Sequence, residues 1–475
     1  MQPAVLLDAV IDDLRTAGQQ VELRSMDTAP SPALVDATHD SRKVADGVLF
    51  CAVPGERFDG HDFAAGAVAS GAPALLVERF VDVDIAQLRV DRVRAAMPIA
   101  AATVHRHPSE ELAVVGVTGT NGKTTTTHLL AAILRSLGRI VDVVGTLGGV
   151  HTTPEATDLQ RRFRADADAG VDIVAAEVSS HALDQHRADA VSFAVAAFSN
   201  LTPDHLDYHR DMASYFDAKR RLFDGRAAAE LINVDDEWGR RLADERPSAL
   251  RLSLESVQVV VADARGTTFE WRGQQVRLPM PGMMNVANAL MAAEAAMVLG
   301  GEPEAITAGL AATPQVPGRM ELVEVAGAPV TAIVDYSHTP DSIERALAAI
   351  RASAPDAFVT IVFGCGGDRD RAKRPLMGRA AEAGADLVIV TSDNPRSEDP
   401  TGIIDDAVAG MLDPTTARIE VDRRSAIRLA AAATPPGGVV LVAGKGHEQT
   451  QTIGDEALPF DDVAEAAAAL EELLL

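Results

Sequence analysis

The sequence is poor in cysteine and in positive charge. Only two cysteines, Cys51 and Cys365, occur in 475 residues, so no disulfide framework is expected and a reducing, cytoplasmic compartment is favoured. Lysine and arginine number 43 against 69 acidic residues, and the formal charge of −26 argues against nucleic acid as a partner. An anionic substrate must therefore be held by local basic side chains or backbone N–H groups.

Long apolar runs are also absent. No segment reaches the roughly 18 apolar residues that a membrane span requires. The first residues, MQPAVLLDAVIDDLRTAG, carry acidic side chains early and predict an amphipathic helix, not a signal peptide. We therefore expect no membrane insertion, and a monomer is the default expectation for the oligomeric state.

Lysine is rare beside arginine. Because arginine occupies most of the positions that need a cation, each lysine is a candidate for chemistry that requires an amine, although chance retention is an equal alternative. The five lysines are Lys43, Lys123, Lys219, Lys373 and Lys445.

The chain divides into three regions. A length prior of roughly 150 residues per domain predicts about three domains, and we place them at 1–110, 111–317 and 318–475. In the second and third regions, apolar runs such as LAVVGV and VVLVAG alternate with helical patterns. This alternation predicts an α/β fold with parallel sheets covered on both faces.

Polar clusters follow seven of the predicted strands. In open parallel sheets, ligands bind at the carboxyl ends of the strands, so these clusters mark two functional sheet edges. The clusters read TGTNGKT, EVSSH, SNLTPDH, DYSHTPD, GCGGDRD, SDNPR and GKGHE.

The stretch TGTNGKTTT has the features of a phosphate-binding loop, although its glycine spacing departs from G-x-x-x-x-G-K-[ST]. Gly119 and Gly122 let the backbone approach phosphates, Lys123 reaches the terminal phosphates, and the Thr124 hydroxyl suits Mg²⁺. The alternative is a threonine-rich helix cap after a tight turn. The strand–loop–helix context favours the phosphate loop.

Two further clusters carry candidate metal ligands. Glu177 ends a predicted strand and can hold a metal, or it can be a solvated carboxylate at a helix N-terminus. In NLTPDHLDYHRD, His205 and His209 have i,i+4 spacing, which raises a zinc alternative. With no HExxH motif and no nearby cysteine, a role of His205 beside Mg²⁺ is favoured.

The third region contains the elements of a zwitterion site. Arg369 and Arg396 can bind a carboxylate, whereas Asp393 and Glu448 can accept hydrogen bonds from an amine. Each loop alone is as well explained as a surface turn with solvated charges.

Taken together, the motifs resemble the Mur ligase family. The resemblance rests on TGTNGKTT, EVSSHALDQHR, SNLTPDHLDYH, PGMMNVANAL, VPGRME, DYSHTPDS, GCGGDRDRAKRPLMG, DNPR and GKGHE, and it runs from about residue 36 to residue 462. It implies a three-domain α/β architecture with a central P-loop ATPase-type parallel sheet and a C-terminal Rossmann-like domain, which moves to close over the nucleotide. TGTNGKTT alone would indicate only the wider superfamily.

The resemblance also implies a reaction in peptidoglycan precursor synthesis. ATP phosphorylates the D-glutamate carboxylate of UDP-MurNAc-L-Ala-D-Glu, and the amine of an amino acid attacks the acyl phosphate. A carboxylate is a poor electrophile, so activation is required, and positioning with charge neutralisation supplies most of the catalysis.

The resemblance implies roles for individual residues. Lys123, Glu177, His205 and Lys219 are the implied catalytic residues, and Lys219 is the implied carbamylated lysine (N6-carboxylysine). The implied Mg²⁺ ligands are Thr124, Glu177, His205 and carbamylated Lys219. The implied ATP contacts are Gly119, Thr120, Asn121, Gly122, Lys123, Thr124, Thr125, Asn285, Arg319 and Asp335. The implied uridine-nucleotide contacts are Ser41, Glu56, Arg57, Phe58, Thr152, Thr153, Ser179, Gln185 and Arg187. The implied amino-acid contacts are Arg369, Asp393, Asn394, Pro395, Arg396, Gly444 and Glu448.

The DNPR sequence resembles that of family members that add meso-diaminopimelate. Arg396 suits the distal carboxylate that lysine lacks, so diaminopimelate is favoured over lysine. A paralogue with another acceptor and a regulatory pseudoenzyme are the remaining alternatives. Met284, His151 and His39 depart from the family pattern, as does the missing arginine after FDD.

Overall fold

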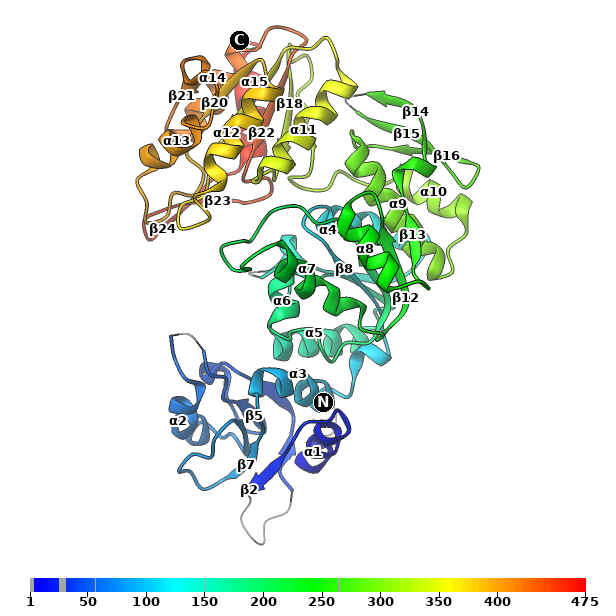
Figure 1. Ribbon diagram of the computed structural model, residues 1–475, viewed down its shortest axis with the longest axis vertical. Coiled ribbons are helices and arrows are strands. Elements are labelled where there is room, and N and C mark those ends of the chain that lie inside the picture. Colours follow the sequence, from blue (N-terminus) through cyan, green and yellow to red (C-terminus); the bar gives the residue numbers. More distant parts are fainter. Residues whose placement is uncertain (1–3, 25–30, 56, 150, 264) are drawn as a thin grey trace. The chain divides into compact units, whose positions relative to one another are not determined.

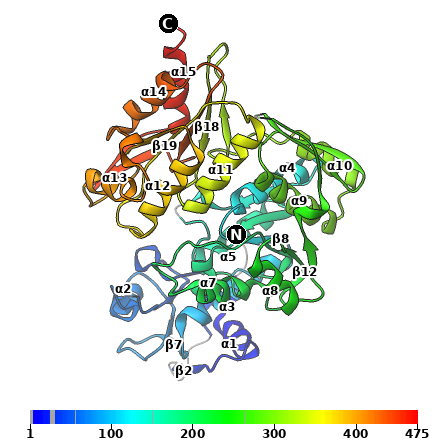
Figure 2. The same cartoon turned by 45° about the horizontal axis from the view of Figure 1, so that its top comes forward.

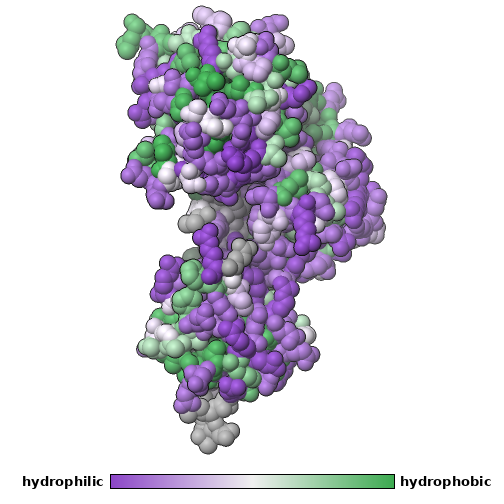
Figure 3. All heavy atoms as spheres, turned by 60° about the vertical axis from the view of Figure 1, so that its left-hand side comes forward, coloured by the Kyte–Doolittle hydropathy of each residue, from purple (hydrophilic) through white to green (hydrophobic). Residues whose placement is uncertain are grey.

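The computed structural model describes residues 4–24, 31–55, 57–149, 151–263 and 265–475 (Figure 1). Contacts within the chain group it into two compact units. The first unit is Met1–Thr118, Gly138–Ala197 and Asp217–Glu230; the second is Gly119–Leu137, Phe198–Phe216 and Leu231–Leu475. The division at residues 110 and 317 stays a prediction. Figure 3 shows a face on which hydrophilic residues prevail, in keeping with the charge of −26.

The first unit begins with a five-stranded sheet. Its strand order is β2 (Glu22–Arg24), β7 (Ala86–Arg89), β6 (Ala74–Val77), β5 (Val48–Cys51) and β4 (Asp36–Thr38). All neighbours are parallel except β2 and β7. Helices α1 (Leu7–Thr16) and α3 (Val93–Val104) cover one face, and α2 (Ala64–Ala69) covers the other. The predicted N-terminal helix is confirmed as α1, and the short strands β1 (Val5–Leu6) and β3 (Ala33–Leu34) pair beside it.

A second sheet has six strands, and its strands β11 and β12 each have residues in both units. The order is β13 (Leu250–Leu252), β12 (Ala227–Asn233), β11 (Phe193–Phe198), β8 (Ala113–Thr118), β10 (Ile173–Glu177) and β9 (Val141–Val144). Strand β10 is parallel to β8 and β9, and β12 is parallel to β13. The helices of this part of the chain are α4 (Lys123–Ser136), α5 (Ala156–Asp168), α6 (Ser180–Asp184), α7 (Met212–Arg220), α8 (Glu237–Glu245), α9 (Met283–Val298) and α10 (Pro303–Ala311).

The third sheet, in the second unit, is also covered on both faces (Figure 2). Its order is β17 (Glu321–Val323), β18 (Thr331–Asp335), β22 (Val439–Ala443), β19 (Val359–Phe363), β20 (Leu387–Val390) and β21 (Arg418–Ile419), with β17 alone antiparallel. In β22, Leu441 packs with α11 (Pro340–Ser353), α12 (Lys373–Gly384) and α13 (Pro400–Val408). Its neighbours Val440 and Val442 pack with α14 (Arg423–Ala433) and α15 (Asp462–Glu472). Alternate side chains of one strand thus enter two cores, which explains its continuous apolar sequence.

Two antiparallel elements were not predicted. Strands β14 (Gln258–Asp263), β15 (Gly266–Trp271) and β16 (Gln274–Leu278) form a small sheet, and β23 (Thr450–Ile453) pairs with β24 (Glu456–Pro459). The valines of β14 are exposed, so this strand lacks the alternating burial that marks a core strand. No helix among the described residues is long and apolar enough to cross a membrane.

Candidate active site

Each of the seven polar clusters follows a strand, as predicted. TGTNGKT follows β8, EVSSH overlaps the end of β10, and SNLTPDH follows β11. The other four stand at the ends of β18, β19, β20 and β22 of the third sheet. Parallel neighbours present these ends at one edge, so residues distant in sequence are collected into sites.

The phosphate loop has the predicted strand–loop–helix form. Helix α4 begins at Lys123, and its N-cap residue Gly122 is left-handed at φ 87°. A Cβ at Gly122 would overlap the side-chain amide of Asn288, so a larger residue would displace the loop. The Lys123 ammonium donates to the carbonyls of Gly119 (2.8 Å) and Thr120 (2.7 Å), which curls the side chain back over the loop.

The predicted nucleotide residues of the second unit lie near this loop. Arg319 Nη2 donates to Thr124 Oγ1 (3.2 Å), and the same guanidinium stacks 4.4 Å from the ring centre of Tyr336. Asp335 Oδ2 accepts from the backbone N–H of Met320 (2.7 Å), which orders the segment around Arg319. Burial raises the pKa of the Asp335 carboxyl.

Other members of the predicted nucleotide set contact neighbouring segments of the second unit. Asn285 Nδ2 donates to the carbonyl of Pro281 (2.8 Å), and Thr120 Oγ1 stands 3.1 Å from the Tyr215 hydroxyl. The backbone N–H of Asn121 donates to Asn200 Oδ1 (2.9 Å), and Thr125 is buried. Asn288 and Tyr336 were not predicted, although both stand within motifs quoted for the resemblance.

In the first unit, Glu177 is buried at the end of β10. Its Oε1 accepts from the backbone N–H of Thr146 (2.8 Å) and its Oε2 from the Thr146 hydroxyl (3.2 Å). The alternative of a solvated carboxylate is therefore wrong for Glu177. A group that binds this carboxylate must share its two oxygens with Thr146.

Five of the predicted uridine-nucleotide residues form one network next to Glu177. Thr153 Oγ1 donates to the Glu177 carbonyl (2.8 Å) and accepts from the Ser179 N–H (3.0 Å). Arg187 donates to the Thr153 carbonyl (2.9 Å) and to Gln185 Oε1 (2.8 Å). Thr152 Oγ1 lies 3.1 Å from Thr146 Oγ1. The Arg187 Nε is buried and has no hydrogen-bond partner among the described residues.

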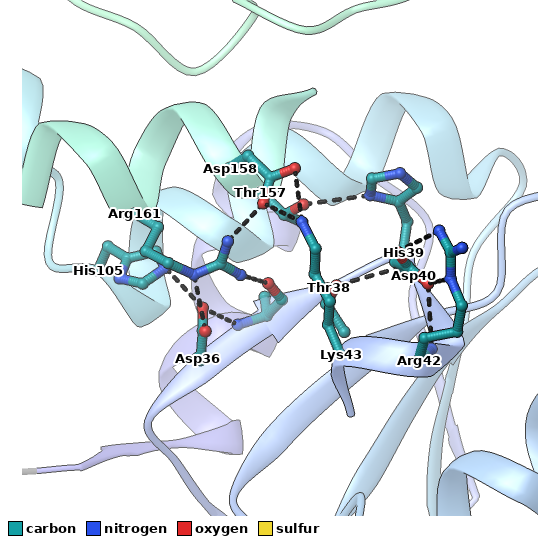
Figure 4. A network of polar contacts seen from close by, with 11 residues as sticks. Asp36, Thr38, His39, Asp40, Arg42, Lys43, His105, Thr157, Asp158 and Arg161 are labelled. Carbon is teal, nitrogen blue, oxygen red and sulfur yellow. Dashed lines mark hydrogen bonds and ion pairs between the residues drawn. The ribbon is translucent and has the colours of Figure 1, made fainter. Parts of the chain in front are cut away.

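Ser41 begins the short 3-10 helix Ser41–Lys43 elsewhere in the first unit. Residues on either side of it in the chain belong to a polar network that joins β4 to α5 (Figure 4). The Lys43 ammonium meets Asp158 Oδ1 (3.1 Å), and His39 Nδ1 stands 3.2 Å from Thr157 Oγ1. Arg161 Nε donates to Asp36 Oδ2 (2.8 Å). These contacts fix the ends of the segment that carries Ser41.

Two more of the predicted uridine-nucleotide residues lie in the loop after β5. Arg57 is exposed, and 72% of Phe58 is exposed, so the structure packs neither into a core. Glu56 lies outside the described residues.

Lys219 and His205 differ in burial. Lys219, on α7, is only 1% exposed, whereas the His205 side chain is 44% exposed in a turn with φ 54°. The His209 N–H donates to the His205 carbonyl (2.8 Å), but no helix forms here, and His209 is buried. Across the described ranges, no three His, Cys, Asp or Glu side chains are grouped to hold a metal ion.

The predicted amino-acid residues meet at the carboxyl edge of the third sheet. Asn394 Nδ2 donates to Glu448 Oε2 (2.7 Å), and Arg396 Nη1 donates to the Gly367 carbonyl (2.6 Å). A Cβ built at Gly366 would lie 3.2 Å from Arg396 Nη1 and 3.5 Å from Arg369 Cγ, so both arginines line the same glycine-rich turn. Pro395 stiffens the loop between Asn394 and Arg396.

Asp393 and Gly444 pack against each other within this site. Asp393 is buried, which raises the pKa of its carboxyl, while the nearby positive charges of Arg423 and Lys445 act in the opposite direction. Gly444 has φ 116°, and a Cβ there would overlap Asp393 Oδ2. Lys445 was missing from the predicted site, although the scarcity of lysine had drawn attention to it.

Family models match three successive segments. They are described as the Mur ligase family, catalytic domain (residues 37–120), the Mur ligase middle domain (117–296) and the Mur ligase, glutamate ligase domain (318–446). The UDP-N-acetylmuramoyl-L-alanyl-D-glutamate–2,6-diaminopimelate ligase of Solibacter usitatus is 41% identical over 482 residues, covering 93% of this chain and 95% of the relative. The chain belongs to the Mur ligase family.

Solved structures agree with this membership. A structure of a UDP-N-acetylmuramoyl-L-alanyl-D-glutamate–2,6-diaminopimelate ligase is 32% identical, with a TM-score of 0.69 over 99% of this chain and 100% of that one. The MurF ligase of Thermotoga maritima in complex with ADP is 21% identical, with a TM-score of 0.64 over 92% of this chain and 97% of that one. The second likeness shows the shared fold, so the predicted Mur ligase architecture is confirmed.

Proposed function

We propose that this Mur ligase is an ATP-dependent amide ligase that adds meso-diaminopimelate to UDP-MurNAc-L-Ala-D-Glu in peptidoglycan precursor synthesis. The observation that carries the proposal is the DNPR loop, where Asn394 contacts Glu448 and Arg396 lines the turn of Arg369. Two arginines and two carboxylates in one site match an amino acid with several charged groups. The full-length likeness to diaminopimelate ligases agrees with this chemistry.

ATP is the proposed phosphoryl donor. Backbone N–H groups of the loop 119–125 would bind phosphate oxygens, and Lys123 would leave its carbonyl partners to neutralise the terminal phosphate. Arg319 is already ordered by Tyr336 and Thr124, so it can bind the nucleotide with little loss of side-chain entropy. Asn285 and Asp335 would complete the nucleotide site.

Four residues would hold Mg²⁺: Thr124, Glu177, His205 and Lys219 as a carbamate. The donor set fits a hard cation because three of the four supply oxygen. Lys219 is 1% exposed, and a carbamate would convert its buried amine into an anionic ligand. When bound, Mg²⁺ neutralises charge on the transferring phosphoryl group.

The chain's own residues would then position the two reacting groups. Thr152, Thr153, Ser179, Gln185 and Arg187 would bind the uridine-nucleotide substrate together with Ser41, Glu56, Arg57 and Phe58. Glu448 and Asp393 would accept hydrogen bonds from an amino group, and Arg369 and Arg396 would bind carboxylates. The amine of the amino acid would attack the acyl phosphate that ATP forms on the D-glutamate carboxylate. This attack forms the amide C–N bond, breaks the acyl–phosphate bond and releases phosphate and a proton.

Further parts of the proposal follow from the family. We propose three domains, at 1–110, 111–317 and 318–475, which bind the uridine nucleotide, ATP and the amino acid in that order. We also propose a cytoplasmic monomer that works on small-molecule substrates. Sedimentation of the purified protein tests the monomer.

The test is phosphate release with ATP, Mg²⁺ and UDP-MurNAc-L-Ala-D-Glu, measured with meso-diaminopimelate, with L-lysine and with no amino acid. We expect release with diaminopimelate alone, together with the mass of the matching tripeptide. Release with lysine alone would keep the ligase and overturn the role of Arg396. No release with any amino acid, while ATP still binds, would favour a paralogue with another acceptor or a regulatory protein.

A further inference from the structure

The amino-acid site is built over a buried cation, Lys445. This lysine is 0% exposed, whereas the Glu448 side chain beside it is 33% exposed. The Lys445 ammonium lies 3.2 Å from Asn394 Oδ1 and 3.1 Å from Glu448 Oε2. With no exposed surface, Lys445 cannot touch a substrate, so any effect on the reaction must pass through its neighbours Asn394, Glu448 and Asp393.

Lys445 and its neighbours fix the direction of the Asn394 amide. Asn394 Oδ1 accepts from Lys445 and from the backbone N–H of Thr452 (2.9 Å), and its Nδ2 donates to Glu448 Oε2 (2.7 Å). Rotating the amide by half a turn would point its NH₂ group at two donors and its oxygen at a carboxylate. The flipped state would lose all three hydrogen bonds, so one orientation is selected.

The same contacts leave the two oxygens of Glu448 in different situations. Both hydrogen bonds that this carboxylate receives from the described residues end on Oε2. Oε1 receives none of them and belongs to a side chain that solvent reaches. A cationic amine that enters the site therefore meets a carboxylate oxygen that is oriented and available.

Charge supports this arrangement. The negative charges of Asp393 and Glu448 repel each other, and a nearby cation offsets this repulsion. Lys445 lies 3.1 Å from Glu448, and its charge also acts on Asp393. It thus stabilises two carboxylates that would otherwise shift toward their neutral forms, in which they attract an ammonium group less strongly.

We infer that Lys445 is a positioning residue of the amino-acid site, which orients Asn394 and presents Glu448 Oε1 to the amino group of the incoming amino acid. The inference rests on the proposed ligase function and extends it to a residue behind the binding surface. Lys445 controls affinity for the amino acid, whereas the sites for ATP and for the uridine nucleotide do not depend on it.

The test uses steady-state phosphate release by the full chain carrying Lys445→Met, with each of the three substrates varied in turn. We expect KM for the amino acid to rise by about 10- to 100-fold, the effect of losing hydrogen bonds to a charged group. KM for the other two substrates should stay within about twofold. Lys445→Gln, which keeps a donor, should recover part of the affinity.

A double-variant cycle separates positioning from general damage. If Lys445 acts largely through Glu448, the loss of affinity in Lys445→Met/Glu448→Gln should be clearly smaller than the sum of the losses in the two single variants. The matched control is Arg351→Met, which removes a cation with three hydrogen-bonding contacts at the other end of the third sheet, at Gly384, Ala357 and Asp386. This control should leave every KM unchanged.

Each remaining outcome decides the question. An unchanged KM for the amino acid, an equal rise in all three KM values, or additive effects in the cycle would overturn the inference while leaving the ligase intact. Loss of folding in both Lys445→Met and Lys445→Gln would assign the residue a structural role only, and would also overturn it. An inactive wild-type protein would instead refute the proposed function.

Discussion

Arg423 and Asp462 form a two-point ion pair from which solvent is fully excluded. Arg423 Nε lies 2.8 Å from Asp462 Oδ1, Nη2 lies 2.7 Å from Oδ2, and both side chains are 0% exposed. Arg423 begins α14, Asp462 begins α15, and Arg423 also donates to the carbonyl of Ala443 (2.9 Å). The pair therefore joins two helices to the strand end that precedes Gly444.

We predict that Asp462→Asn lowers the free energy of unfolding by about 3–5 kcal/mol, because a buried guanidinium is left without its counter-charge. Replacing both partners, as in Arg423→Met/Asp462→Leu, should cost less than Asp462→Asn alone. Chemical denaturation measures both values. A loss of less than about 1 kcal/mol in Asp462→Asn would contradict this account.

The neighbouring residue supplies a matched control. Arg424 pairs with Glu465 between the same two helices, but its side chain is 49% exposed. Arg424→Ala should therefore change the free energy of unfolding by no more than about 1 kcal/mol. The contrast between the buried pair Arg423–Asp462 and the partly exposed pair Arg424–Glu465 shows the effect of burial.

Lys219 should be essential for turnover. We predict that Lys219→Ala lowers kcat by at least about 100-fold, because under the proposed function it removes a ligand of the catalytic cation. Added bicarbonate should not restore activity, since the variant has no amine to carbamylate. The next residue along α7 is the control: the Arg220 side chain is 48% exposed, and Arg220→Ala should keep its activity. Full activity of Lys219→Ala would refute the carbamate role.

Arg396 should determine which amino acid is used. We predict that Arg396→Asn raises KM for meso-diaminopimelate by about 10- to 100-fold while KM for ATP changes little, because a charged hydrogen bond is lost. Phosphate release with each substrate varied measures both constants. Arg371→Asn is the control, since Arg371 is 70% exposed and pairs with Glu398. Equal losses for ATP and diaminopimelate would point to damage of the whole domain.

The sequence predicted those parts of the site that depend on local order. A continuous apolar run followed by a polar cluster identified each strand end, and TGTNGKT was correctly placed at the junction of β8 and α4. These features depend on neighbours in the chain, so periodicity and turn chemistry reveal them.

Contacts made across the fold were not predictable in the same way. Lys445 and Asn394 are 51 residues apart in sequence, and they meet because the ends of β22 and β20 lie at the same edge of the parallel sheet, on either side of β19. Arg423 and Asp462 are 39 residues apart, and they meet because α14 packs beside α15. Strand β14 was missed because its exposed valines give no burial pattern. Glu177 alone suggested a solvated carboxylate, and only the fold revealed Thr146 beside it.

Acid should lower the stability of the loop that carries Arg396, because it protonates the nearby Glu398. Arg374, whose side chain is 0% exposed, donates to Glu398 Oε1 (2.8 Å) and Oε2 (3.1 Å). These bonds, together with one from the backbone N–H of Asp368 (2.6 Å), lower the pKa of Glu398 to about 2. Because this pKa lies below the ordinary value of 4.5, the stabilisation is complete above pH 4.5 and disappears as the pH falls toward about 2.

We therefore predict that Glu398→Gln is less stable than the wild type at pH 7 and that the difference shrinks steadily between pH 4.5 and about 2. Denaturant unfolding across this range measures the difference, and subtracting the two curves removes the contribution of every other carboxylate. Glu344→Gln, at an exposed position of α11, should follow the wild-type curve throughout. A difference between Glu398→Gln and wild type that stays constant with pH would show that Glu398 acts by packing, because only a charge interaction is lost on protonation.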